Sequence, residues 1–272
     1  MLKTAVILAA GMGRRLAERG RDVPKGFLQL GDEPIIEESI ARLRRAGIER
    51  IVIVTGHLRE YYEALAGRYS CLVQTLHNDL YRDSGSMYSL YLARDVVQEP
   101  FLLLESDLIY EQRALTTLCA SPSDNALLLS GFTGAGDEVF VEAHDGNLVR
   151  MSKRREDLGP RIAGELVGIS RLSVGLFDTM LRLAAERFAT TLHMDYETDC
   201  MVAAASQVPI RCELVPDLLW SEIDDEAHYQ RARLHIYPAV LERGTSRGAC
   251  DPPDPHHAHP LVDTTSGSET RY

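Results

Sequence analysis

The chain has 272 residues, 45% hydrophobic and 25% charged, a composition typical of a globular protein with one large α/β domain or two small ones. Its net charge of −11 argues against a broad nucleic-acid surface, because such surfaces are rich in Lys and Arg. The five cysteines are scattered without a C-x-x-C pair, and no apolar run reaches the roughly 18 residues of a membrane span, so we expect a cytoplasmic protein with reduced thiols and no membrane contact.

An uncharged run at residues 4–10 opens the chain and leads into a glycine loop. The run has the length of a strand, and its lack of charge predicts a central strand that is covered on both faces. Gly11 and Gly13 would let a ligand approach the backbone N–H groups closely, and Arg14 and Arg15 follow them. Pro24-Lys25 then adds a fixed turn and one mobile cation. We interpret this combination as a site for a triphosphate.

Two other phosphate motifs do not fit this loop. A Rossmann dinucleotide fingerprint requires a third glycine at the position of Leu16, and a Walker A loop ends in Gly-Lys-Ser/Thr, which is absent here. The remaining alternative is an ordinary turn between a strand and a helix that carries two glycines and surface arginines.

Helices and strands are expected to alternate through the next hundred residues. Apolar spacing predicts helices at 33–46, 59–67 and 87–97, and strands at 50–55, 70–76, 101–104 and 126–130. Because parallel strands need crossover helices, this alternation predicts right-handed βαβ units and a parallel sheet.

A polar loop at residues 77–86 separates the third strand from its helix. Ligands of open α/β sheets bind at the carboxyl ends of the strands. Ser84, Gly85 and Ser86 are small enough for a nucleobase to lie against the backbone, and Ser86 is a candidate N-cap. The alternative is a capped loop that binds no ligand.

Acidic residues follow the strand expected at 101–104, in the order Glu105-Ser106-Asp107. Carboxylates at a buried strand end are costly unless a positive group meets them. Mg²⁺ bound to substrate phosphates would be such a partner, since it prefers one or two carboxylates plus phosphate oxygens. The alternative for Asp107 is the N-cap of a helix at 111–120.

The second half of the chain carries candidates for a second substrate. An Asp-Gly-Asn turn predicts a hairpin of strands 139–143 and 148–152, and Lys153 leaves it where an acceptor phosphate would arrive. A strand at 164–170 contains Glu165, and a helix is expected at 174–188. Asp195 and Glu197 open a helix at 196–205, where they either suit the helix dipole or bind an amine-bearing acceptor.

The C-terminal part is predicted to hold a late strand at 210–215 and a closing helix at 226–241. Residues 242–272 lose the apolar periodicity and are rich in Pro, Gly, Ser, His and Asp, so we expect a disordered tail after a single domain at 1–241. Nothing in the sequence decides the oligomeric state, and a homodimer is one allowed assembly.

Taken together, these segments resemble the nucleotidyltransferases that join a nucleoside triphosphate to a phosphorylated small molecule. The family pattern L-A-A-G-x-G-x-R-L is matched at 8–16, its P-K step at Pro24-Lys25, and its G-x-P-[LI]-[IL] segment at 31–36 with one extra residue. An E-[IV]-D-[DST] ending is matched at 222–225. The loop at 84–90 and Gly164-Glu165 are similar to the CTP:phosphocholine and CTP:2-aminoethylphosphonate cytidylyltransferases.

The resemblance implies a Rossmann-like three-layer α/β/α sandwich with a mostly parallel sheet, and a small β insertion at about 131–171 over the acceptor site. It implies transfer of CMP from CTP to a small phosphonate or phosphate, with 2-aminoethylphosphonate favoured, phosphocholine next, and pyrophosphate released. The alternatives are a sugar- or inositol-1-phosphate nucleotidyltransferase and a nucleotide-binding regulatory module without catalysis.

The resemblance also implies roles for individual residues. Arg15 and Lys25 are expected to act in catalysis, and Asp107 and Asp224 to hold Mg²⁺. The residues expected at the nucleotide are Leu8, Ala9, Ala10, Gly11, Met12, Gly13, Arg14, Ser84, Gly85, Ser86 and Ser106. Those expected at the acceptor are Lys153, Glu165, Asp195 and Glu197.

Overall fold

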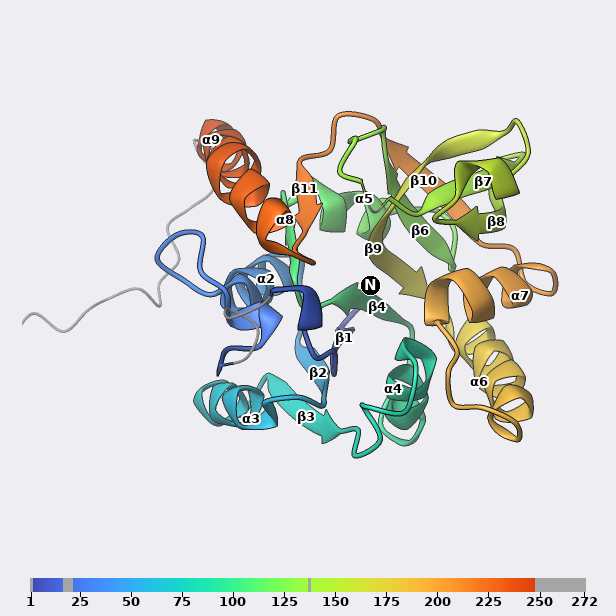
Figure 1. Cartoon of the computed structure of the whole chain (residues 1–272), viewed down its shortest axis with the longest axis horizontal. Coiled ribbons are helices and arrows are strands. Elements are labelled where there is room, and N and C mark those ends of the chain that lie inside the picture. The colour runs from blue at the N-terminus through green and yellow to red at the C-terminus, as the bar shows by residue number, and fades with distance from the viewer. Residues whose placement is uncertain (1, 17–21, 137, 248–272) are drawn as a thin grey trace, which may run out of the picture.

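The computed structural model describes residues 2–16, 22–136 and 138–247. A nine-stranded sheet in the order β3-β2-β1-β4-β9-β6-β10-β8-β7 forms its centre, with helices on both faces (Figure 1). The strands are β1 (Thr4–Ala9), β2 (Arg50–Thr55), β3 (Val73–His77), β4 (Phe101–Glu105), β6 (Ala126–Ser130), β7 (Phe140–His144), β8 (Asn147–Ser152), β9 (Ile162–Leu172) and β10 (Arg211–Val215). No helix in the described part of the chain combines the length and apolar character needed to cross a membrane.

Counted from the β3 end of the sheet, the first four strands, β3, β2, β1 and β4, are mutually parallel. Strands β6 and β10 are parallel to each other. Strand β9 runs antiparallel between β4 and β6, so it is the reversed strand in the middle of the sheet. The mostly parallel sheet expected from the sequence is therefore confirmed. The carboxyl ends of β1, β2 and β4, at Ala9, Thr55 and Glu105, lie along one edge of the sheet.

Two apolar layers enclose the sheet, and alternate residues of β1 face each of them. Val6 and Leu8 join a core with helices α4 and α6, whereas Ala5 and Ile7 join a core with helices α2, α3 and α5. This alternation follows from the two-residue period of a strand, and it produces the three-layer sandwich. The helices are α2 (Ile35–Arg45), α3 (Arg59–Arg68), α4 (Ser86–Leu92), α5 (Arg113–Ala120) and α6 (Val174–Phe188).

The hairpin of β7 and β8 closes the far end of the sheet. Its turn places Asp145 and Gly146 at φ values of 50° and 76°, as the Asp-Gly pair predicts. Strand β7 pairs with β8 and also with the beginning of β9, so the sheet curls back on itself there. The last part of the insertion expected at 131–171 forms β9, which lies between β4 and β6 in the sheet.

A second, two-stranded sheet was not predicted. Strand β5 (Leu108–Tyr110) follows Asp107 directly and pairs antiparallel with β11 (Trp220–Glu222). The pairing continues to the Ile223 N–H, which donates to the Asp107 carbonyl oxygen at 3.2 Å. This small sheet brings the E-I-D segment alongside the end of β4.

The C-terminal helix covers the N-terminal loops. Helix α8 (Glu226–Arg231) continues through the turn η6 (Ala232–Ile236) into α9 (Tyr237–Arg247), and it packs on an apolar cluster that contains Leu16, Leu28 and Ile223. The tail boundary expected at 242 was too early, because α9 continues to Arg247. The rest of the predicted tail, 248–272, lies outside the described residues.

Candidate active site

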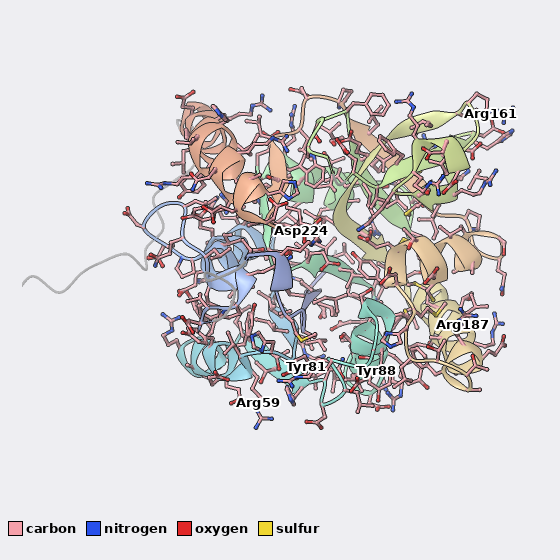
Figure 2. All side chains as sticks on the ribbon, in the orientation of Figure 1. Arg59, Tyr81, Tyr88, Arg161, Arg187 and Asp224 are labelled. Atoms are coloured by element: carbon pink, nitrogen blue, oxygen red, sulfur yellow. The ribbon has the colours of Figure 1, made fainter. Side chains whose placement is uncertain are left out.

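Lys25 lies between two aspartates that are far apart in the sequence. Asp107 follows β4, Asp224 follows β11, and Lys25 begins the short turn η2 (Lys25–Phe27). The Lys25 Nζ atom is 2.7 Å from Oδ2 of Asp107 and 2.7 Å from Oδ1 of Asp224. Both carboxylates are buried, and only 17% of the lysine side chain is exposed. Asp224 also lies close to the molecule's centre in Figure 2.

The charges of this triad depend on one another. Burial lowers the pKa of Lys25, but the carboxylates of Asp107 and Asp224 raise it more, so that its pKa lies above the ordinary value. Lys25 therefore stays protonated and compensates part of a buried negative charge that would otherwise be costly.

Glu222 adds a third carboxylate to the cluster. Carboxylate oxygens of Asp107, Glu222 and Asp224 all lie within 4.8 Å of one another. Burial, together with the nearby charges of Asp107 and Asp224, raises the pKa of Glu222 to about 10. An all-oxygen donor set of three carboxyl groups suits a hard divalent cation such as Mg²⁺. These residues therefore fit the metal expected from the sequence, and Glu222 is a ligand candidate that the sequence did not predict.

The glycine loop lies beside this cluster through Arg15. One Nη atom of Arg15 is 2.6 Å from Oδ1 of Asp224, while 58% of the side chain is exposed. Gly13 has φ 58°, and its carbonyl oxygen accepts from the Leu16 N–H at 3.0 Å. A Cβ atom on Gly11 would meet nothing within 4 Å, so the loop borders open space. The short turn η1 (Arg14–Leu16) thus places the Arg15 guanidinium beside Asp224.

The residues expected around the nucleotide differ in what they can offer. The side chains of Leu8, Ala9 and Ala10 are buried in the core, so a ligand would meet their backbone. Met12 is half-buried at the loop. Ser106 is buried, and its N–H donates to the Leu8 carbonyl oxygen at 3.1 Å.

The predicted base loop is occupied by contacts within the protein. Ser84 Oγ donates to the Leu80 carbonyl oxygen at 2.8 Å. The Gly85 N–H donates to the Leu192 carbonyl oxygen at 2.9 Å. Ser86 was expected to cap α4, but it is the first residue of that helix and Gly85 precedes it. Contact of these three residues with a base stays a prediction.

Three of the expected acceptor residues lie in different surroundings. Glu165 is buried, and both of its carboxylate oxygens accept from the Thr133 N–H, at 3.0 and 2.9 Å. It therefore holds the loop after β6 in place. Lys153 is exposed, and its charge acts on Glu197. Asp195 is exposed and accepts from Ser86 Oγ at 3.3 Å.

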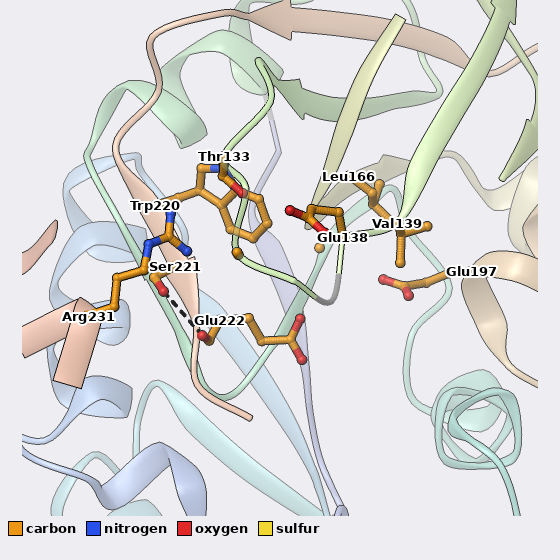
Figure 3. Close-up of a pocket in the computed structure, with 11 residues that line it drawn as sticks. Thr133, Glu138, Val139, Leu166, Glu197, Trp220, Ser221, Glu222 and Arg231 are labelled. Carbon is orange, nitrogen blue, oxygen red and sulfur yellow. Dashed lines mark hydrogen bonds between the residues drawn. The ribbon is translucent and has the colours of Figure 1, made fainter. Parts of the chain in front are cut away.

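A pocket adjoins the acidic cluster and shares Glu222 with it (Figure 3). Glu138, Glu197 and Glu222 bring three carboxyl groups to this pocket, and Trp220 and Arg231 contribute an indole and a guanidinium. Burial raises the pKa of Glu138, but backbone N–H groups at 135, 136 and 138 lower it more, so this carboxylate stays ionised. The other lining residues are Thr133, Ala135, Val139, Leu166, Gly168 and Ser221.

Glu197 is the expected acceptor residue that reaches this pocket. It belongs to the π-helical turn η5 (Tyr196–Met201), which leads into α7 (Val202–Ala205). Its pKa is raised to about 7, mainly by burial, although a hydrogen bond from Tyr196 and the charge of Lys153 act in the opposite direction. Sequence reasoning missed Glu138 and Trp220, because neither lies in a recognisable motif.

A model of the MobA-like NTP transferase domain matches residues 5–190 of the chain. The chain belongs to this family. The nucleotidyltransferase resemblance seen in the sequence is therefore confirmed, and the glycine loop and Asp107 lie inside the matched region.

Two relatives of this chain are named for phosphonates. The CMP-5'-(3-aminopropyl)phosphonate synthase of Streptomyces rubellomurinus is 29% identical over 249 residues, which are 86% of this chain but only 39% of that protein. The 2-aminoethylphosphonate cytidylyltransferase of Lancefieldella rimae is 30% identical over 191 residues, covering 70% of this chain and 74% of that protein.

Solved structures show the same fold. The inositol-1-phosphate CTP transferase from T. maritima gives a TM-score of 0.75 at 20% identity, covering 89% of this chain and 97% of that chain. The CTP:phosphocholine cytidylyltransferase from Streptococcus pneumoniae gives 0.67 at 20% identity, covering 86% and 98%. The expected Rossmann-like α/β/α fold is confirmed.

Proposed function

We propose that the protein is a Mg²⁺-dependent cytidylyltransferase that transfers CMP from CTP to a small phosphonate or phosphate that carries an amine. One observation carries this proposal: the buried charged cluster of Lys25, Asp107 and Asp224 pairs with Arg15 of the glycine loop and adjoins an acidic pocket through Glu222. A triphosphate at the loop and an acceptor in the pocket would meet at the cluster.

In the proposed reaction, an acceptor oxygen attacks the α-phosphorus of CTP in line, and the bond to pyrophosphate breaks. The acceptor oxygen is already ionised near neutral pH, so the reaction needs no general base. Positioning and charge neutralisation are then the main contributions of the protein.

The charged side chains divide this work. Asp107, Asp224 and Glu222 would hold Mg²⁺, which supplies positive charge to the substrate phosphates when bound. Lys25 would stabilise the charge at the α-phosphate, and Arg15 the charge on the leaving pyrophosphate. The exposed N–H groups of the glycine loop would bind phosphate oxygens.

The acceptor class follows from the pocket. Apart from Glu222, which would hold the metal, Glu138 and Glu197 bring two carboxyl groups to the pocket beside the single guanidinium of Arg231, so the pocket favours a cationic headgroup. The relatives named for aminopropyl- and aminoethylphosphonate support an amine-bearing phosphonate and support cytidine as the base. We rank 2-aminoethylphosphonate first and phosphocholine second.

The test is release of pyrophosphate with Mg²⁺ and each of CTP, UTP, ATP and GTP. The acceptors are 2-aminoethylphosphonate, 2-hydroxyethylphosphonate, phosphocholine, inositol 1-phosphate and glucose 1-phosphate. We expect turnover with CTP and 2-aminoethylphosphonate. Turnover with a sugar or inositol phosphate alone would contradict the proposed acceptor class. CTP binding without turnover on any acceptor would contradict the proposed enzymatic activity.

A further inference from the structure

The hydroxyl group of Tyr196 is buried behind the acceptor pocket. The side chain is 2% exposed, and its Oη atom donates to Oε1 of Glu197 at 2.8 Å. Glu105, at the end of β4, also interacts with this hydroxyl. Because Glu197 lines the pocket (Figure 3), the hydrogen bond from Tyr196 restrains one of the carboxyl groups of the pocket.

Backbone hydrogen bonds also hold Tyr196 in place. Its N–H donates to Ser86 Oγ at 3.0 Å, and the Met87 N–H donates to the Met194 carbonyl oxygen at 3.0 Å. Both contacts attach the start of η5 to the first turn of α4. Tyr196 is therefore held in place against α4, and its hydroxyl can in turn hold the Glu197 carboxylate in place.

Glu197 has a competing partner. The charge of Lys153, at the exposed end of β8, attracts the Glu197 carboxylate. Without the Tyr196 hydroxyl, the carboxylate would be free to turn toward this lysine. With it, one carboxylate oxygen is held and the other is left to accept a hydrogen bond from a ligand.

We propose that Tyr196 is a positioning residue that selects acceptors with a primary ammonium group by orienting Glu197 in the pocket. The inference rests on the proposed function, because it takes the pocket to be the acceptor site. A primary ammonium donates hydrogen bonds to an oriented carboxylate, whereas a quaternary ammonium has no N–H and relies on aromatic faces. Among the described residues that line the pocket, Trp220 alone is aromatic.

The first test is Tyr196→Phe, which keeps the ring and removes the hydroxyl. We expect the KM for 2-aminoethylphosphonate to rise about tenfold, the effect of losing one hydrogen bond to a charged group. The kcat, the KM for CTP and the KM for 2-hydroxyethylphosphonate should stay near their wild-type values. The matched control is Tyr88→Phe, since Tyr88 packs on Phe188 and lies away from Asp224 in Figure 2.

A second variant separates positioning from packing. Glu197→Gln should raise the KM for the amine acceptor at least as much as Tyr196→Phe does. In the Glu197→Gln background, Tyr196→Phe should add little, because both changes remove the same interaction. Additive effects, or an equal rise for the amine and hydroxyl acceptors, would overturn the inference. If Tyr196→Phe does not fold, the ratio of the KM values for 2-aminoethylphosphonate and 2-hydroxyethylphosphonate in Glu197→Gln decides.

Wild-type activity distinguishes failure of this inference from failure of the proposed function. A wild-type enzyme that uses CTP but prefers 2-hydroxyethylphosphonate or phosphocholine to 2-aminoethylphosphonate would overturn the inference and leave cytidylyl transfer in place. A wild-type protein that releases no pyrophosphate with CTP and any acceptor would overturn both.

Discussion

Lys25 makes contacts that suit two roles: it pairs with the carboxylates of Asp107 and Asp224, and it can stabilise the charge of the substrate phosphates. In the structure its Nζ atom bridges Asp107 and Asp224, the carboxylates that we propose as metal ligands. A cation that binds these oxygens must share them with the lysine or displace it. Lys25 would then be released toward the substrate phosphates, which is where the proposed reaction needs it.

Replacing Lys25 should separate these two roles. In Lys25→Met we expect tighter Mn²⁺ binding without nucleotide, by several-fold up to about tenfold, because one competing charged hydrogen bond per carboxylate is removed. Turnover should fall strongly. Titration of Mn²⁺ by electron paramagnetic resonance measures the affinity. Lys3→Met is the control, since Lys3 pairs with Glu49 on the surface. Weaker Mn²⁺ binding in Lys25→Met would contradict the competition.

Asp107 should be essential for the rate. Asp107→Ala removes one carboxylate of the cluster, and we expect kcat to fall by at least about 10²-fold, the usual cost of losing one electrostatic stabiliser. Pyrophosphate release at saturating Mg²⁺ measures this. Asp124→Ala is the matched control, because 86% of the Asp124 side chain is exposed. Near-normal turnover in Asp107→Ala would exclude Asp107 from the metal site.

At the scale of elements, α4 and η5 behave as one unit. Gly85 precedes α4, and a Cβ atom placed on it would lie 2.3 Å from the Met194 carbonyl oxygen. A side chain at this position would therefore push the two segments apart. The requirement for glycine here comes from close backbone packing, where the sequence alone favoured space for a nucleobase.

Gly85→Ala should destabilise the protein by about 1–3 kcal/mol, the usual cost of overpacking a tight site. The matched control is Gly67→Ala on the exposed side of α3, where a Cβ atom meets nothing within 4 Å. That change should stabilise the protein by about 0.4–1 kcal/mol, because alanine favours a helix. Urea unfolding of both variants measures the difference. Equal stability of the two would show that the Met194 segment moves freely.

At the scale of the whole molecule, the C-terminal helix contacts two segments that support the site. Tyr229 Oη donates to the Gln29 carbonyl oxygen at 2.9 Å, and Arg243 donates to the buried Glu111 at 2.9 Å. Glu111 also accepts from the Leu219 N–H at 3.1 Å, just before β11. The helix thus supports the segments that carry Lys25 and Glu222.

Arg243→Ala should lower the free energy of unfolding by about 1 kcal/mol, because it removes a hydrogen bond to a buried carboxylate that still keeps Arg113. The arginine is one-third exposed, which limits the effect. Urea unfolding measures it, and the exposed Arg233→Ala should stay within about 0.5 kcal/mol of wild type. An unchanged midpoint in Arg243→Ala would show that the helix is held by its apolar face alone.

Local patterns in the sequence were sufficient for most of the fold. The apolar runs gave β1, β2 and β6, and the helical spacing gave α2 and α6, because such patterns depend on which face of a segment is buried. The glycine loop and Asp107 were also found, since they follow strands directly. The strands β5 and β11 were missed, because each is short and is stable only beside the other.

Taken by itself, the sequence was therefore enough for the βαβ plan, the position of the glycine loop and the acid at the end of β4. Only the tertiary structure decided that Lys25 lies between Asp107 and Asp224, 199 residues from the latter, and that Glu222 joins them. The same holds for the reversed β9 and for the hydrogen bond between Tyr196 and Glu197 behind the pocket. Periodicity records which face of a segment is buried, whereas the partner of a side chain depends on how distant segments pack.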